Sequence, residues 1–259
     1  MSVIKKKFKW LAENNESALI AYITAGYPTL DDSIRYIKEI ILGGADMIEI
    51  GIPFSDPIAD GRTIQYASNI ALKNGVNLSK TLNRISNLKI EMPVIIMSYL
   101  NPINAYGIEQ FFKRASESGI SGVIIPDLVV EESYRLKGVA RKNAIDLIQL
   151  VAPTTNDERI RMIGEYSDSF VYCVAVTGTT GVRKRLPATL PLFIKRVKSL
   201  TEKPVVVGFG ISRVNQIKAL SILADGIVVG SRLIEAIKKG ENLCRLIKKF
   251  KNATIKQLL

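Results

Sequence analysis

The chain has 259 residues, of which 47% are apolar, and it carries a formal net charge of +12. It contains no histidine, which excludes Ser-His-Asp hydrolysis, histidine general bases and the common histidine-rich zinc and iron sites. Its two cysteines, Cys173 and Cys244, are too few for a disulfide framework and suit a reducing compartment.

The positive charge is spread along the chain and is dense only near residues 5–7 and 248–251. A basic protein of this kind could bind nucleic acid, but no base-reading motif is present, so we favour a solvated surface and expect no nucleic-acid partner. No apolar run is long enough to span a membrane, and no apolar segment of a secretory signal follows the first lysines. We therefore expect a cytoplasmic protein, or one of the plastid stroma if it is plastid-encoded.

Along the chain, a helical pattern near Ile4–Asn14 comes first, and eight short apolar runs rich in β-branched residues follow it. Helical patterns, with apolar residues at intervals of three and four, separate these runs, as in 30–44, 108–119, 131–143, 190–200 and 211–223. The predicted strands are 18–26, 47–54, 94–100, 122–128, 145–153, 170–177, 205–210 and 226–231.

Strands that alternate with helices must pair in parallel, because a parallel neighbour needs a crossover connection. Eight such units without a linker predict an α/β fold, a single-domain (β/α)8 TIM barrel over residues 1–259. The extra N-terminal helix would close the barrel's lower end. A doubly wound open sheet is the alternative, but its G-x-G-x-x-G fingerprint is missing from ITAGYPTLDD after the first strand.

Glu49 lies in the middle of the second predicted strand, MIEIGIPF. Side chains alternate along a strand, so if Ile48 and Ile50 face the helices, Glu49 faces the barrel interior. A buried carboxylate needs a partner or shifts its pKa upward. An arginine or a hydroxyl in a core network could neutralise it. No strand supplies an inward cation, and three tyrosines end strands, which favours a general acid/base. These tyrosines are Tyr22, Tyr99 and Tyr172.

Two further carboxylates follow on the loop after that strand. Asp60 would be either the N-cap of a helix that begins near residues 61–63, or a second site carboxylate with a different pKa. Asp56, in Ser-Asp-Pro, is better suited to a turn. We predict a functional role for both Glu49 and Asp60.

A phosphate site is predicted where strands seven and eight end. GFGIS (208–212) and VGSRLIEAI (229–237) each lead from a strand into a helix, and helix N-termini bind anions. TGTTG (177–181) after strand six lacks the lysine of a nucleotide-binding loop, so a nucleoside triphosphate is not indicated. The alternative is ordinary glycine turns with a serine helix cap. The residues expected to approach a phosphate here are Gly208, Gly210, Gly230 and Ser231.

The available side chains limit the chemistry. Imine formation needs a lysine at a strand end, and Lys184 is the nearest candidate, several residues out on a loop. Metal-dependent carbon–carbon cleavage normally needs a histidine cluster. The remaining choice is metal-free proton transfer by carboxylates, in an isomerisation, a dehydration or a cleavage whose leaving carbon belongs to an easily protonated ring.

Motifs along nearly the whole chain resemble the α subunit of tryptophan synthase. In order they are IAYITAGYP, IEIGIPFSDPIADGRTIQYAS, MSYLNPI, IIPDL, VAPTT, VTGTTGVR, GFGIS and VGS. The resemblance implies a TIM barrel that cleaves indole-3-glycerol phosphate to indole and D-glyceraldehyde 3-phosphate without a metal. It also implies that indole passes to a β subunit for L-tryptophan synthesis, in an α2β2 tetramer. Pyridoxal phosphate (PLP) would belong to that partner, and no cofactor to this chain.

The same resemblance assigns roles to residues. Glu49 would protonate the indole C3 carbon, and Asp60 would bind the indole N–H and stabilise the charge on the ring. The expected substrate-binding residues are Tyr22, Tyr99, Tyr172, Thr180, Gly181, Phe209, Gly210, Gly230 and Ser231. The chain departs from the family pattern at Arg62 and Val129, where proline is usual, and in the TGTTG segment.

Two other functions remain open on the sequence alone. One is another phosphate-binding barrel, such as a phosphoribosyl isomerase or the synthase that makes indole-3-glycerol phosphate. The other is a subunit that activates a partner and has little chemistry of its own.

Overall fold

The computed structural model describes residues 1–174, 187–208 and 210–256. In this part of the chain, eight parallel strands form a closed barrel in sequential order, and β8 pairs with β1. The strands are β1 (Ala18–Thr24), β2 (Met47–Gly51), β3 (Val94–Met97), β4 (Ile120–Ile124), β5 (Asp146–Val151), β6 (Val171–Val174), β7 (Val205–Gly208) and β8 (Gly226–Val229). The predicted TIM barrel is confirmed, and the open sheet is excluded by barrel closure.

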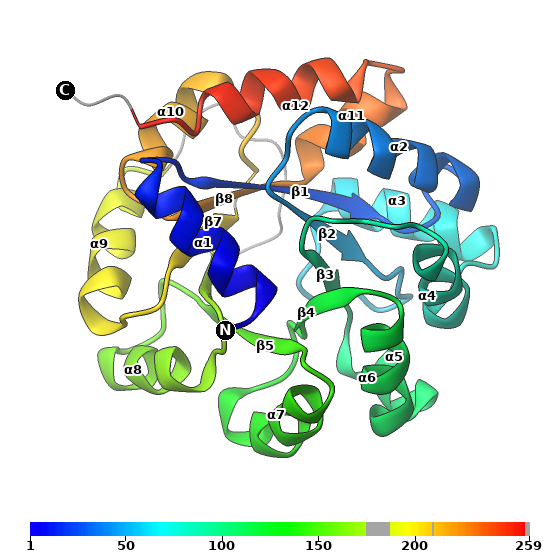
Figure 1. The fold of residues 1–259 in the computed structure, drawn as a ribbon, viewed down its shortest axis with the longest axis horizontal. Coiled ribbons are helices and arrows are strands. Elements are labelled where there is room, and N and C mark those ends of the chain that lie inside the picture. Colours follow the sequence, from blue (N-terminus) through cyan, green and yellow to red (C-terminus); the bar gives the residue numbers. More distant parts are fainter. Residues whose placement is uncertain (175–186, 209, 257–259) are drawn as a thin grey trace.

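Helices surround the strands, as Figure 1 shows. They are α1 (Val3–Glu13), α2 (Leu30–Leu42), α3 (Arg62–Lys73), α4 (Leu78–Ser86), α5 (Leu100–Tyr106), α6 (Ile108–Glu117), the 3-10 turn η1 (Val130–Glu132), α7 (Ser133–Lys142), α8 (Asp157–Tyr166), α9 (Leu190–Leu200), α10 (Val214–Ser221), α11 (Ser231–Lys238) and α12 (Leu243–Asn252). Several begin at a Ser, Thr or Asn whose side chain accepts a main-chain N–H of the first turn, at Ser2, Thr29, Asn77, Asn156 and Asn242. None of the described helices is long and apolar enough to cross a membrane.

The predicted N-terminal helix, α1, covers the amino-terminal end of the barrel. Ile4 reaches inside, where a Cβ added to Gly122 of β4 would lie 2.8 Å from the Ile4 Cδ1. Phe8 packs on Phe170, just before β6, with 5.5 Å between ring centroids. This end is therefore filled by side chains.

Strand pairing ends earlier than the apolar runs predict. The second run was expected to reach residue 54, but β2 ends at Gly51, although Ile52 is still buried. Tyr99 was expected to end a strand. It lies beyond β3, at the N-cap position of α5. Ile52 still donates its main-chain N–H to the Met97 carbonyl at 2.8 Å, but regular pairing with β3 ends at Gly51, so an apolar run overestimates a strand.

At the amino-terminal end of the barrel, three aspartates link neighbouring strands through the same pair of hydrogen bonds. Each lies just before a strand, and its carboxylate accepts the main-chain N–H of the preceding strand. The bonds are Leu19 N–Asp46 Oδ2 at 2.8 Å, Leu147 N–Asp168 Oδ2 at 3.0 Å and Val205 N–Asp225 Oδ2 at 2.8 Å. Each aspartate also returns its own N–H to the same residue's carbonyl.

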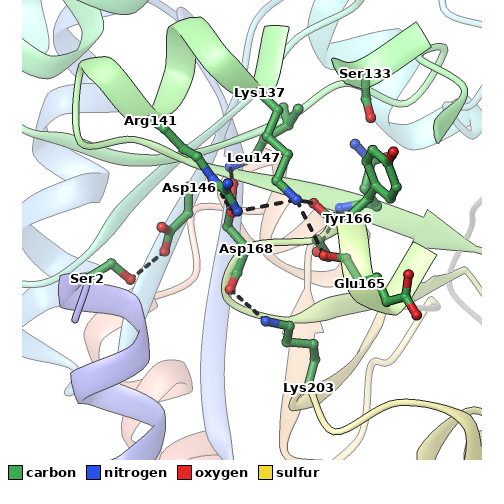
Figure 2. Close-up of polar contacts among 12 residues, drawn as sticks. Ser2, Ser133, Lys137, Arg141, Asp146, Leu147, Glu165, Tyr166, Asp168 and Lys203 are labelled. Carbon is green, nitrogen blue, oxygen red and sulfur yellow. Dashed lines mark hydrogen bonds and ion pairs between the residues drawn. The ribbon is translucent and has the colours of Figure 1, made fainter. Parts of the chain in front are cut away.

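Each of these carboxylates is paired with a cation. Lys251 lies 2.7 Å from Asp46, and Lys198 lies 2.8 Å from Asp225. Asp168 lies 2.9 Å from Arg141 and 3.8 Å from Lys137. Figure 2 shows these residues together. These three carboxylates are thus satisfied and structural, as expected for the stability face of such a barrel.

Candidate active site

A cavity of about 540 Å³ opens at the carboxyl ends of the strands. Its volume is in the range of small-molecule sites. Strand residues Tyr22, Glu49, Met97 and Tyr172 line it, together with Asp60 from the loop after β2. The cavity lies where active sites of TIM barrels lie.

Glu49 faces this cavity from β2, between Tyr22 of β1 and Ile95 of β3 in the ladder. It is only 1% exposed, and neither of its carboxylate oxygens has a hydrogen-bond partner among the described residues. No core network therefore neutralises it there. Burial, reinforced by the negative charge of Asp60, raises the pKa of Glu49 from 4.5 to about 8. Such a carboxyl holds its proton at neutral pH.

Asp60 does not cap a helix. The N-cap of α3 is Gly61, and α3 has no side-chain cap bond, so the predicted alternative in which Asp60 is the N-cap is wrong. Its carboxylate is instead hydrogen-bonded by the Tyr99 hydroxyl, which itself accepts the Ala59 N–H at 2.9 Å. Burial raises the pKa of Asp60 to about 6, and the bond from Tyr99 opposes that rise. At neutral pH the pair Glu49–Asp60 thus holds one proton and one negative charge, with the proton on Glu49.

Two tyrosine side chains each lie directly against a glycine of the next strand. A Cβ on Gly51 would lie 2.1 Å from the Tyr22 hydroxyl, and one on Gly208 would lie 2.2 Å from the Tyr172 hydroxyl. Gly208 thus makes room for a tyrosine, where the sequence pattern suggested the close approach of a phosphate. Burial raises the pKa of both tyrosines well above the usual value, so both remain neutral.

The anion-binding features gather at the start of α11. Ser231, the first residue of that helix, is 5% exposed and lines the cavity, and its N-cap is Gly230. Helix N-termini leave main-chain N–H groups unbonded, and these attract anions. Gly210, with φ of +48°, also lines the cavity.

The start of α10 differs from the prediction. GFGIS was expected to open this helix, but α10 begins at Val214. The Gln216 side chain accepts the N–H groups of Ser212 and Arg213 at 2.9 and 3.1 Å, so these donors are already used. The helix terminus that remains open to a ligand is that of α11.

Several predicted residues lie outside the described part of the chain: Thr180, Gly181, Phe209, Lys184 and the TGTTG segment. Of the others, Tyr22, Glu49, Asp60, Tyr172, Gly210, Gly230 and Ser231 line one cavity. Tyr99 does not line it and acts on Asp60.

Sequence reasoning missed several lining residues, among them Met97, Leu150 and Gln149. Strand alternation could have found the first two, which face inward with Glu49 and Tyr172. Among residues 1–174, 187–208 and 210–256, no group of three His, Cys, Asp or Glu side chains could hold a metal ion.

Comparisons with known proteins agree with this geometry. Residues 8–258 match the family model described as tryptophan synthase alpha chain. The chain is 42% identical over 257 residues to the tryptophan synthase alpha chain of Aquifex aeolicus, across 97% of this chain and 98% of that one. It is 45% identical over 240 residues to that of Carboxydothermus hydrogenoformans, across 92% and 90%. A structure of Mycobacterium tuberculosis tryptophan synthase superposes with a TM-score of 0.93 at 32% identity, over 99% of both chains. The chain therefore belongs to the tryptophan synthase alpha chain family.

Proposed function

We propose that Glu49 is the acid–base catalyst by which this chain carries out the reaction of its family, the cleavage of indole-3-glycerol phosphate to indole and D-glyceraldehyde 3-phosphate. The observation that carries the proposal is the state of Glu49. It is a buried carboxyl without a hydrogen-bond partner in the described structure, and it shares a cavity with the N-terminus of α11. A carboxyl that keeps its proton at neutral pH is suited to protonate carbon.

In the first step, the Glu49 proton goes to indole C3. The ring electron pair forms the new C–H bond, and positive charge develops at the ring nitrogen. Asp60, which is ionised above its pKa of about 6, accepts the indole N–H and stabilises that charge. The two carboxyl groups thereby divide the work, because their surroundings give them different pKa values.

In the second step, the bond between C3 and the glycerol carbon breaks, and its electron pair returns to the ring. The hydroxyl on that carbon loses its proton to the Glu49 carboxylate and becomes the aldehyde oxygen. Indole and D-glyceraldehyde 3-phosphate result, and Glu49 is again protonated. The protonated ring serves as the electron sink, so we propose that this chain uses no cofactor and no metal of its own.

The phosphate group fits the start of α11, where Ser231 adds a hydroxyl to the main-chain donors and Gly210 approaches from the loop after β7. Tyr22 and Tyr172 support the indole ring from the wall of the barrel. Thr180, Gly181 and Phe209 remain predicted substrate contacts.

A partner is also part of the proposal. The family name implies a β subunit, to which PLP belongs, and we propose an α2β2 tetramer in the cytoplasm, or in the plastid stroma if the chain is plastid-encoded. Exposed apolar side chains near the cavity support a docking surface there. Ile58 is 79% exposed, and Val129, one of the two departures from the family pattern, is 45% exposed.

Incubation of the purified chain with indole-3-glycerol phosphate tests the function directly. Indole and D-glyceraldehyde 3-phosphate should form in equal amounts without added metal or PLP. Asp60→Asn should lower kcat about 10²- to 10³-fold, as for loss of one electrostatic stabiliser, while Asp56→Asn on the same loop should change it little. A chain that only activates a partner would release no indole alone, and that result would reject the catalytic role.

A further inference from the structure

One arm of the cavity lies outside the barrel wall, between β5 and α8. It is lined by Gln149 of β5, Arg159 and Ile163 of α8, and Val130 of η1. Alternation along β5 places Gln149 on this outer side. Its neighbour Ile148 points inward, where its Cδ1 would lie 3.0 Å from a Cβ added to Gly122. We call this region the β5–α8 arm.

Gln149 is an unusual residue for such a position. It is 4% exposed, and its side-chain amide makes no hydrogen bond to any described residue. Its main-chain N–H is already bonded to the Ser167 hydroxyl at 3.1 Å, so the amide is the group that borders the arm. The amide is open to the cavity, and its hydrogen-bonding capacity is not used by any described residue, so a ligand in the arm can bond to it.

The rest of the arm selects against charged ligands. Arg159 binds Glu131 through both guanidinium nitrogens, at 2.5 and 2.8 Å, so this pair is neutral overall. Val130 and Ile163 are apolar walls, and both are buried. The Thr155 hydroxyl oxygen accepts the Ala152 N–H at 3.1 Å. The arm thus fits a neutral, mainly apolar molecule with one group that bonds to an amide.

We propose that the β5–α8 arm is a second binding site for indole, whose N–H donates to the amide oxygen of Gln149. Indole is flat, neutral and apolar apart from one N–H donor, which matches the arm. The arm is continuous with the cavity that contains Glu49 and Asp60. This inference rests on the proposed function in one respect, because the proposed cleavage is the reaction that supplies indole to the cavity. A product held in the arm leaves the two catalytic carboxyl groups free for the next substrate.

Binding can be tested without catalysis. The chain is labelled with ¹³C at isoleucine and valine methyl groups, loaded with indole and then saturated with indole-3-propanol phosphate. This analogue fills the active site but lacks the hydroxyl that loses its proton in the reaction. The methyl signals of Ile163 and Val130 should shift saturably with indole concentration while the analogue is bound. Ile163→Val identifies the isoleucine signal.

Substitutions then test the hydrogen bond. Gln149→Leu should raise the indole Kd about threefold to tenfold, as for loss of one neutral hydrogen bond, and Gln149→Met should do the same. Gln110→Leu, the same change at an exposed residue of α6, should leave the Kd unaltered. Absence of a saturable shift at Ile163 and Val130, or an unchanged Kd in both Gln149 variants, would overturn the second site. Failure to cleave the substrate would reject the proposed function and leave this binding result intact.

Discussion

The hydroxyl of Tyr22 lies over Gly51 so closely that a Cβ at the glycine would be 2.1 Å from it. Tyr22 pairs across the ladder with Glu49, and Gly51 is two residues further along β2. In the same way, Tyr172 of β6 pairs with Val206 of β7, and its hydroxyl lies against Gly208, two residues further along β7. A glycine two positions past the cross-strand partner thus admits a tyrosine ring at the cavity wall.

Gly51→Ala should therefore destabilise the chain, by about 1–3 kcal/mol in the free energy of unfolding, because the tyrosine must move. Urea denaturation measures this. Tyr22→Leu in the same chain should recover most of the loss, since the clash disappears. Gly138→Ala, at an exposed position of α7 where a Cβ would meet nothing within 4 Å, is the control and should be neutral or stabilising. Equal effects at both glycines would refute the packing argument.

The pH dependence of indole release should be bell-shaped. Activity needs Glu49 protonated and Asp60 ionised, so kcat/KM should fall below about pH 6 and above about pH 8. These limits belong to the coupled pair. In Asp60→Asn the acidic limb should vanish while the alkaline limb remains. A profile that rises steadily with pH would mean that Glu49 works as the ionised base from the start.

Tyr99 should control the acidic limb through Asp60. Its hydroxyl hydrogen-bonds the Asp60 carboxylate and lowers the pKa of that group. Tyr99→Phe removes the bond, so the pKa of Asp60 should rise and the acidic limb should move to higher pH. Tyr134→Phe, at an exposed position on α7, supplies the matched control. An acidic limb that stays in place in Tyr99→Phe would show that Tyr99 has only a packing role.

Ser231 should affect substrate binding more than turnover. Ser231→Ala removes one hydroxyl from the start of α11, where the phosphate is proposed to bind. A lost hydrogen bond to a charged group costs about 1.5–3 kcal/mol, which predicts a KM raised about 10- to 100-fold with kcat little changed. Steady-state kinetics measure both. Inhibition by inorganic phosphate should weaken in parallel, and an unaltered KM would place the phosphate elsewhere.

Much of the fold could be predicted from the sequence, because apolar periodicity encodes both the strands and the amphipathic helices. Glu49 could be located by alternation alone, since a charge between Ile48 and Ile50 leaves only one face for it. Boundaries were less predictable. Ile52 is buried and donates its N–H to Met97 just past the end of β2, and periodicity does not show where regular pairing stops.

The bonding pattern of the site could not be predicted. Tyr99 reaches Asp60 from a different unit of the barrel, and the Gln216 side chain occupies the N–H groups at the start of α10. Both depend on loop geometry that no local pattern encodes. Gln149 was missed for a related reason, since its isolation becomes visible only when the neighbouring side chains are in place.

The raised pKa of Glu49 should also make the free energy of unfolding depend on pH. Its pKa in the folded chain, about 8, is above the ordinary value of 4.5 expected when unfolded. Between pH 4.5 and 8 the unfolded chain loses this proton while the folded chain keeps it, so the free energy of unfolding falls as pH rises. The glutamine of Glu49→Gln does not titrate, so its free energy of unfolding does not fall in this way. The variant should therefore be more stable than the parent at pH 9, by an amount on the order of 5 kcal/mol. The two should be similar below pH 4.5.

The most direct measurement is the rate of indole release from indole-3-glycerol phosphate by Glu49→Gln, with folding verified by circular dichroism. One positioned acid/base group contributes about 10²- to 10⁴-fold, so release should fall by at least about a hundredfold while the chain stays folded. Release of indole at the parent rate by the folded variant would contradict proton transfer from Glu49 to the ring.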